Sequence, residues 1–71
     1  MNTTRIKELR KKKNITQLKL AMDLETNQNS ISRYETGEYE ADYGMLKKIA
    51  NYFNVSIDYL LRETDNPERN R

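Results

Sequence analysis

Apolar residues recur three and four positions apart along most of the chain, and this spacing predicts short amphipathic helices. A first helix is expected over about residues 4–13, with Ile6 and Leu9 on its buried face. Thr16, a favourable N-cap residue, begins a second helix, which ends in a turn around Glu25. Two helices are therefore expected before Asn27.

Three further helices are predicted from their capping residues and apolar faces. One covers residues 27–36 and stops at Gly37, and after a loop the next begins behind Asp42. Ser56 caps a short fifth helix. Eight apolar positions are expected to form the core: Leu20, Leu24, Ile31, Leu46, Ile49, Phe53, Ile57 and Leu60. Because no segment alternates apolar and polar residues over the length of a strand, the sequence predicts an all-α fold.

The composition argues against an enzyme. The 71 residues suffice for one small domain, and they include neither Cys nor His. The chain therefore has no disulfide, thiol nucleophile or imidazole base and almost no means of binding zinc. Ser30, Ser32 and Ser56 have no His to activate them. The sequence predicts no catalytic residue, no metal site, no cofactor and no evident small-molecule ligand.

The hydropathy of the chain indicates that it does not enter a membrane. No apolar run approaches the length needed to span a bilayer. The basic N-terminus is not followed by the apolar stretch of a secretory signal. We therefore expect a cytoplasmic protein.

Charge is distributed unevenly, although the formal net charge is only +2, from 13 basic and 11 acidic residues. Residues 1–13 contain six basic side chains and one acidic one, whereas residues 35–42 contain four acidic side chains and no basic one. The first segment would attract phosphate and the second would repel it.

The helix predicted at residues 27–36 has an unusual polar face. A solvated face usually carries Glu and Lys, but this one carries Gln28, Asn29, Ser32 and Arg33. Gln and Asn can bond to the N6 and N7 atoms of adenine, Arg can bond to the O6 and N7 atoms of guanine, and a helix fits the major groove. Taken alone, this face is consistent with DNA recognition or with a merely solvated surface.

The stretches "TQLKLAMDLETNQNSISRYETG" and "LKKIANYFNVSIDYLL" make the pattern more specific, because together they resemble the Cro-like, phage-repressor-type helix-turn-helix family, also called XRE. The resemblance runs from about Arg5 to Leu61. It implies a five-helix bundle of the lambda-repressor-like type that binds operator DNA as a dimer. We therefore expect a DNA-binding domain at residues 1–61, followed by a polar tail or linker at residues 62–71.

The resemblance also implies which residues contact DNA. Six positions match the family's DNA-contacting positions: Gln17, Asn27, Gln28, Asn29, Ser32 and Arg33. Gln17 begins the second helix and is expected to meet the phosphate backbone, and Asn27 is expected to cap the third helix. Arg10 and Glu35 match a pair that forms a structural salt bridge in this family, so Arg10 is expected to be partly buried and away from DNA.

Three departures from the family pattern affect these expectations. Glu25 stands where relatives usually have Gly, so a left-handed backbone there would cost on the order of 1 kcal/mol. Glu38 and Glu40 occupy a loop in which relatives commonly carry a basic residue against a phosphate, and Ala41 replaces a Pro. Since phosphate contacts supply most non-specific affinity, we expect a shallow dependence of DNA binding on salt.

Two functions remain in competition. The leading hypothesis is a sequence-specific regulator of transcription, a repressor, that binds double-stranded DNA as a homodimer on a pseudo-palindromic operator with half-sites about one helical turn apart. The alternative is a protein-interaction module of the same fold, such as an antitoxin-like or anti-repressor partner, with weak DNA binding. The acidic loop favours the alternative, as do Leu18 and Met22, which are predicted to be exposed.

Overall fold

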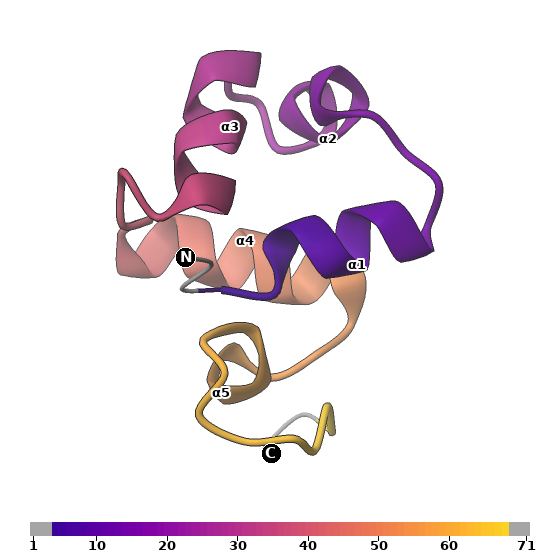
Figure 1. The fold of residues 1–71 in the computed structure, drawn as a ribbon, viewed down its shortest axis with the longest axis vertical. Helices are drawn as coiled ribbons and strands as arrows, with labels where there is room; N and C mark the ends of the chain where they lie inside the picture. Colours follow the sequence, from indigo (N-terminus) through magenta and orange to yellow (C-terminus); the bar gives the residue numbers. More distant parts are fainter. Residues whose placement is uncertain (1–3, 69–71) are drawn as a thin grey trace.

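Five helices follow one another in the computed structural model, which describes residues 4–68. They are α1 (Ile6–Lys12), α2 (Gln17–Asp23), α3 (Gln28–Thr36), α4 (Tyr43–Phe53) and α5 (Ile57–Leu60). No strand occurs within the described residues, so the predicted all-α fold is confirmed. In Figure 1, α2 and α3 form one end of the bundle, α1 and α4 cross its middle, and α5 lies at the opposite end.

Four of the five helices begin at an N-cap residue whose side chain accepts a hydrogen bond from a backbone N–H three residues later. These residues are Thr16, Asn27, Asp42 and Ser56. Each such cap contributes roughly 1 kcal/mol by satisfying an amide that the helix leaves without a partner. Thr16, Asp42 and Ser56 were predicted from the neighbouring residues, and the Asn27 cap was implied by the family resemblance.

The turns between helices require left-handed backbone at several positions. Gly37, with φ of 84°, ends α3 without strain because it has no Cβ. Asn14 and Asn54, each with φ of 57°, follow α1 and α4, and Asn tolerates this region better than most residues. Glu25 has φ of 61° in the turn after α2. The strained turn expected there is therefore present.

Each helix contributes one aliphatic side chain that is fully removed from solvent. These side chains are Ile6, Leu20, Ile31, Ile49 and Leu60, all 0% exposed. Truncating a residue of this kind to Ala typically costs 2–5 kcal/mol. The core therefore sits where all five helices meet, and it fixes α2 and α3 on the rest of the bundle.

The predicted core differs from the structure at two of its eight positions. Leu46 is half-buried and packs against the edge of the core, whereas Ile57 is half-buried and is not part of that packing. Leu46 lies in the first turn of α4 and lines a surface cleft beside the loop that follows α3, and Ile57 is the first residue of α5 and lines another. Val55, which was not among the eight predicted core residues, is buried, at 5% exposed. The chain turns inward one residue before the Ser56 cap, and helical spacing alone does not reveal this turn.

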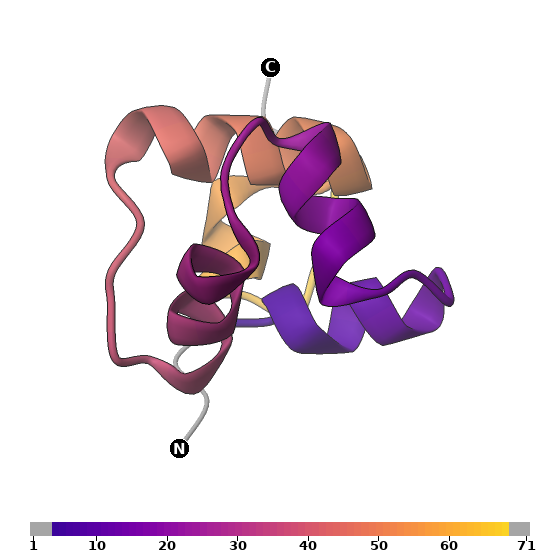
Figure 2. The same ribbon diagram turned by 90° about the horizontal axis from the view of Figure 1, so that it is seen from above.

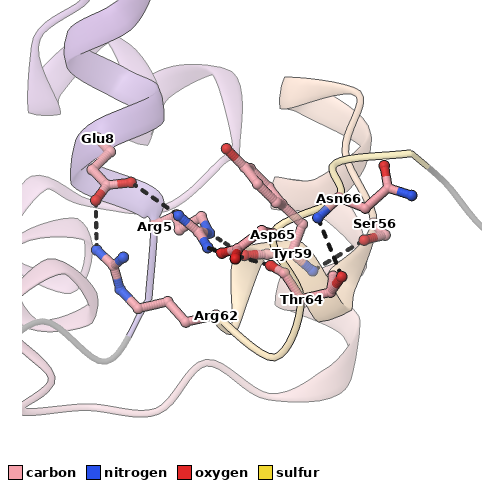
Figure 3. Close-up of polar contacts among 8 residues, drawn as sticks. All are labelled: Arg5, Glu8, Ser56, Tyr59, Arg62, Thr64, Asp65 and Asn66. Atoms are coloured by element: carbon pink, nitrogen blue, oxygen red, sulfur yellow. Dashed lines mark hydrogen bonds and ion pairs between the residues drawn. The ribbon is translucent and has the colours of Figure 1, made fainter.

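The segment after α5 folds back onto the start of α1 (Figure 3). Arg5 is the centre of these contacts: its Nε donates to the Tyr59 carbonyl at 2.8 Å, and its Nη2 donates to Asp65 Oδ1 at 3.1 Å. The guanidinium also lies over the Tyr59 ring, 4.3 Å from the centroid. These contacts join residues almost sixty positions apart in the sequence.

Two further contacts hold the same segment. Arg62 Nη2 lies 2.7 Å from Glu8 Oε1 on α1, and the Ser56 amide donates to the Pro67 carbonyl at 3.1 Å. Residues 62–68 of the predicted tail are thus bonded to the helical body, whereas residues 69–71 lie outside the described residues. The predicted domain boundary at residue 61 stays a prediction. No helix in the described range is long and apolar enough to cross a membrane.

Candidate nucleic-acid interface

Helices α2 and α3 form one unit at an end of the molecule, and Figure 2 looks down on them with α1 and α4 behind. Ala21 is 1% exposed on α2, and its carbonyl accepts a hydrogen bond of 2.9 Å from the Thr26 amide in the turn. The small side chain lets the two helices approach closely. Leu24 and Ile31 fill the angle between them and are 2% and 0% exposed. The bend between the helices is therefore a packed structure rather than a flexible joint.

A second set of contacts fastens this unit to α4. The Tyr52 hydroxyl donates to Asp23 Oδ2 at 2.5 Å, and Lys48 Nζ donates to the Leu24 carbonyl at 3.0 Å. Lys48 Nζ also lies 3.6 Å from a carboxylate oxygen of Glu25. These bonds hold the end of α2 and the strained turn against α4. None of these contacts was predicted, because the partners lie more than twenty residues apart in the sequence.

The hydrogen bond between Tyr52 and Asp23 shifts the pKa of both groups. The Tyr52 hydroxyl holds the pKa of the Asp23 carboxyl below its usual value, and Lys19 acts in the same direction. The same bond raises the pKa of the Tyr52 hydroxyl, because the proton is shared with a carboxylate. Both shifts favour the charge state in which the bond forms, an ionised Asp23 and a protonated Tyr52, and that state holds at neutral pH.

The polar face of α3 points away from the core. Gln28, Asn29 and Arg33 are exposed and Ser32 is half-buried, whereas Ile31 is buried. Asn27 is exposed at the start of the helix, where its Oδ1 accepts a hydrogen bond of 2.8 Å from the Ser30 amide. The predicted division of α3 into a packed side and an outer side is therefore present. That the outer side contacts DNA stays a prediction.

The expected salt bridge joins α1 to the end of α3. Arg10 Nε donates to Glu35 Oε2 at 2.6 Å, and Arg10 Nη2 donates to Glu35 Oε1 at 3.3 Å. The side chains are 12% and 2% exposed, respectively. Arg10 Nη1 also donates to the Ile15 carbonyl at 2.9 Å. The charge is thus buried but satisfied, which is the condition under which a buried ion pair is tolerated.

Gln17 connects this buried pair to the outer face of α3. Its Nε2 donates to Glu35 Oε1 at 3.0 Å, and its Oε1 accepts from Gln28 Nε2 at 3.4 Å. A chain of hydrogen bonds therefore runs from Arg10 through Glu35 and Gln17 to Gln28. It orients two of the predicted site residues from inside the domain, and sequence reasoning missed this orientation although it named all four residues.

Arg33 has neighbours that the sequence did not predict. Its Nε lies 3.7 Å from Glu38 Oε2, and its guanidinium lies over the Tyr39 ring at 5.0 Å from the centroid. Both partners come from the loop directly after α3. The structure thus adds a contact between Tyr39 and a predicted site residue.

Exposed apolar residues and charges complete the surface. Leu18 and Met22 are 54% and 67% exposed on α2, which confirms that they lie outside the core. Lys11, Lys12 and Lys13 are exposed at the end of α1. No group of three or more His, Cys, Asp or Glu side chains within residues 4–68 is placed to hold a metal ion.

A packed pair of short helices with an amide-rich outer face defines a helix-turn-helix protein. The family model described as "Helix-turn-helix domain" matches residues 3–66, and the chain belongs to this family. The match covers α1 through α5 and most of the segment that folds back beyond them.

Curated relatives agree with this assignment. The chain is 38% identical over 66 residues to the HTH-type transcriptional regulator ImmR of Bacillus subtilis (strain 168), covering 93% of this chain and 52% of that protein. It is equally identical over 66 residues to the uncharacterized HTH-type transcriptional regulator YqaE of the same strain, covering 93% of this chain and 57% of YqaE. It is 39% identical over 57 residues to the HTH-type transcriptional activator BcrR of Enterococcus faecalis, covering 80% of this chain and 28% of BcrR. The chain thus spans about half the length of the first two relatives, and all three carry names of regulators rather than enzymes.

Proposed function

We propose that this protein is a sequence-specific repressor that binds double-stranded DNA through the outer face of α3. The observation that carries the proposal is the hydrogen-bonded chain from the buried Arg10 and Glu35 to Gln17 and Gln28. Such a chain holds side chains in one orientation before DNA arrives, and orientation is what base recognition requires. Repression needs only that the domain occupy its operator, whereas activation needs a further contact. Since its partner is DNA, we also propose that it acts in the cytoplasm.

Each site residue has a distinct task in this proposal. Gln28 and Asn29 bond to adenine edges, so each half-site contains A·T pairs, and Arg33 bonds to a guanine. Ser32, half-buried between them, contacts a base or the adjacent sugar-phosphate backbone. Asn27 and Gln17 lie at the starts of α3 and α2, where backbone amides can also meet a phosphate.

We infer that two copies bind a pseudo-palindromic operator, with half-sites about one helical turn apart. A groove of about 320 Å³ along α4 and the start of α5 supports this pairing. It is lined by Lys47 and Asp58, which carry opposite charges, and by Tyr43, which is 68% exposed. A two-fold axis through the groove would set Lys47 of one copy against Asp58 of the other copy.

Sedimentation of charge-exchanged variants tests the homodimer. Lys47→Asp and Asp58→Lys each place like charges across the axis, so each should weaken the dimer. The double variant restores opposite charges and should restore the dimer. A double variant that is as monomeric as the single ones would exclude this groove as the contact.

Selection of bound duplexes from a randomised pool tests the DNA proposal directly. We expect a symmetric site with A·T pairs in each half. Gln28→Ala should relax the preference at one position and cost roughly 1–3 kcal/mol in binding. Asn66→Ala, which removes an exposed amide in the segment after α5, is the matched control and should leave the selected site unchanged. Failure to enrich any sequence would refute the proposal.

The alternative, a protein-interaction module, rests on Leu18 and Met22, which lie four residues apart and are 54% and 67% exposed on α2. A fluorescence titration with random duplex at low salt separates the two functions. Binding in the micromolar range is expected of a DNA-binding domain, because phosphate contacts alone supply it. No binding at any reachable concentration would favour the protein partner.

A further inference from the structure

The loop after α3 turns back onto the helix that it has just left. Gly37, in the left-handed region, reverses the chain, and the Tyr39 amide then donates to the Arg33 carbonyl at 3.2 Å. The Glu38 amide donates to Thr36 Oγ1 at 3.4 Å. These backbone bonds bring the side chains of residues 38 and 39 beside the outer face of α3, where Arg33 lies.

The Arg33 guanidinium is thereby held on two sides. Glu38 Oε2 lies 3.7 Å from its Nε, and the Tyr39 ring lies 5.0 Å from its Cζ. The side chains of Arg33 and Glu38 remain 44% and 65% exposed, so both are accessible to a ligand. Arg33 Nη1 and Nη2 make no hydrogen bond to any other residue between 4 and 68.

We infer that Glu38 and Tyr39 are specificity-determining residues: they position Arg33 so that its two terminal nitrogens meet a guanine, and they oppose its contact with phosphate. The inference rests on the proposed function, since it assigns roles around a residue proposed to contact a base. Glu38 and Tyr39 act through Arg33 and need not touch the DNA themselves.

Tyr39 acts by limiting the rotamers of Arg33. A long side chain that rests on an aromatic ring loses less conformational entropy when it binds, because part of that freedom is already lost. The contact places the guanidinium carbon over the ring, and it gives the guanidinium N–H groups no hydrogen-bond acceptor, so they stay available to a ligand. A bidentate bond to guanine O6 and N7 needs two such groups in one plane.

Glu38 acts by charge. A carboxylate beside Arg33 repels any phosphate that the guanidinium approaches. This repulsion partly cancels the attraction between the guanidinium and the phosphate. The edge of a guanine is a neutral set of acceptors, so its bond to Arg33 is weakened much less. The carboxylate therefore lowers affinity for random DNA more than affinity for the operator, which increases specificity through an unfavourable interaction with the wrong ligand.

The test compares affinities for the selected duplex and for a random duplex at one salt concentration. Glu38→Gln should raise random-duplex affinity about two- to fivefold and selected-duplex affinity less, so the specificity ratio falls by about that factor. Glu40→Gln removes the same charge two residues away and is the matched control. It should raise both affinities together and leave the ratio unchanged. An equal effect of the two variants on the ratio would overturn the role of Glu38.

Tyr39 is tested with a leucine and a phenylalanine. Tyr39→Leu should lower selected-duplex affinity about two- to fivefold with random-duplex affinity unchanged. Tyr39→Phe keeps the ring and should keep the ratio. In an Arg33→Ala background, substitutions at both loop positions should no longer change the ratio, because their effect passes through the guanidinium. A change that persists without Arg33 would overturn the inference.

A measurement without DNA separates this inference from the proposed function. The ¹⁵N relaxation of Arg33 Nε should report an ordered side chain in the unsubstituted protein and a more mobile one in Tyr39→Leu and Glu38→Gln. A mobile Arg33 in the unsubstituted protein would refute the positioning even if DNA is bound specifically. An ordered Arg33 in a protein that selects no duplex would instead refute the DNA proposal, and with it any role of this loop in specificity.

Discussion

Removing the Glu35 carboxylate should destabilise the domain severely. Glu35 is 3% exposed and accepts hydrogen bonds from Arg10 Nε, Arg10 Nη2 and Gln17 Nε2. In Glu35→Gln the shape is nearly kept, but the amide carries no charge and turns an N–H₂ group toward other donors. Arg10, whose side chain is 12% exposed, then retains only the Ile15 carbonyl as a strong partner. Breaking a buried pair in this way costs about 3–5 kcal/mol.

The size of this loss is large against the stability of so small a domain. At roughly 0.05–0.15 kcal/mol per residue, a chain of 71 residues has a free energy of unfolding of about 4–11 kcal/mol. Glu35→Gln should therefore remove about a quarter or more of it. Urea unfolding followed by circular dichroism at 222 nm measures the change, and an unaltered slope with denaturant would show that the unfolded state is unaffected.

Two controls distinguish a stranded charge from a general packing defect. Glu40→Gln, in an exposed loop, should change the free energy of unfolding by less than about 0.5 kcal/mol. The double variant Arg10→Met with Glu35→Leu removes both charges and fills the space, so it should recover most of the loss. A Glu35→Gln protein within about 1 kcal/mol of the parent, or a double variant as unstable as the single one, would refute the reasoning.

Four further predictions concern the turn after α2, the hydrogen bond between Tyr52 and Asp23, the ion pair between Glu8 and Arg62, and the salt dependence of DNA binding. Glu25→Gly should raise the free energy of unfolding by about 1 kcal/mol in urea melts, because φ is 61° at this position; a less stable variant would show that the Glu25 side chain outweighs the backbone strain. In Tyr52→Phe the Asp23 pKa should rise toward the usual value of an Asp carboxyl, as followed by NMR titration, and an unmoved pKa would exclude the hydrogen bond as the cause. The hydrogen bond from Arg62 lowers the Glu8 pKa below 4.5. The ionised Glu8 therefore stabilises the folded state fully above pH 4.5, and this stabilisation is lost as pH falls through the lowered pKa. Glu8→Gln should therefore reduce the loss of stability in acid, and an unchanged pH profile would contradict this. Finally, the logarithm of DNA affinity should fall with the logarithm of salt concentration less steeply than the slope of about −7 expected for eight phosphate contacts.

Local features of this fold were predictable from the sequence, because each depends on a few neighbouring residues. The N-caps at Thr16, Asp42 and Ser56 are examples: each is a short polar residue directly before an apolar spacing of three and four. The packed and outer sides of α3 follow from the same periodicity. The Arg10 to Glu35 bridge was found differently, from the family resemblance, since nothing local marks a pair 25 residues apart.

Contacts between distant segments could not be predicted. Arg5 appeared to be one base among six near the N-terminus, but its side chain is 14% exposed and bonded to Tyr59 and Asp65. The basic segment near the N-terminus should therefore attract phosphate less strongly than the sequence implies. Tyr52 and Tyr39 likewise gave no sign of their partners, since an aromatic residue on a helix or in a loop has many possible neighbours.

The hydrogen-bonded chain across the domain also fixes the direction in which Gln28 can bond to a base. An ionised Glu35 only accepts hydrogen bonds, so Gln17 must turn its Nε2 toward it and its Oε1 toward α3. Gln28 must then donate one of its two amide hydrogens to Gln17. Its Oε1 and second N–H remain for a ligand, and these are the acceptor and donor that the N6 and N7 atoms of adenine require. Under the proposed function, the buried negative charge thus sets the polarity of a side chain on the surface, and neutralising it would relax base preference as well as stability.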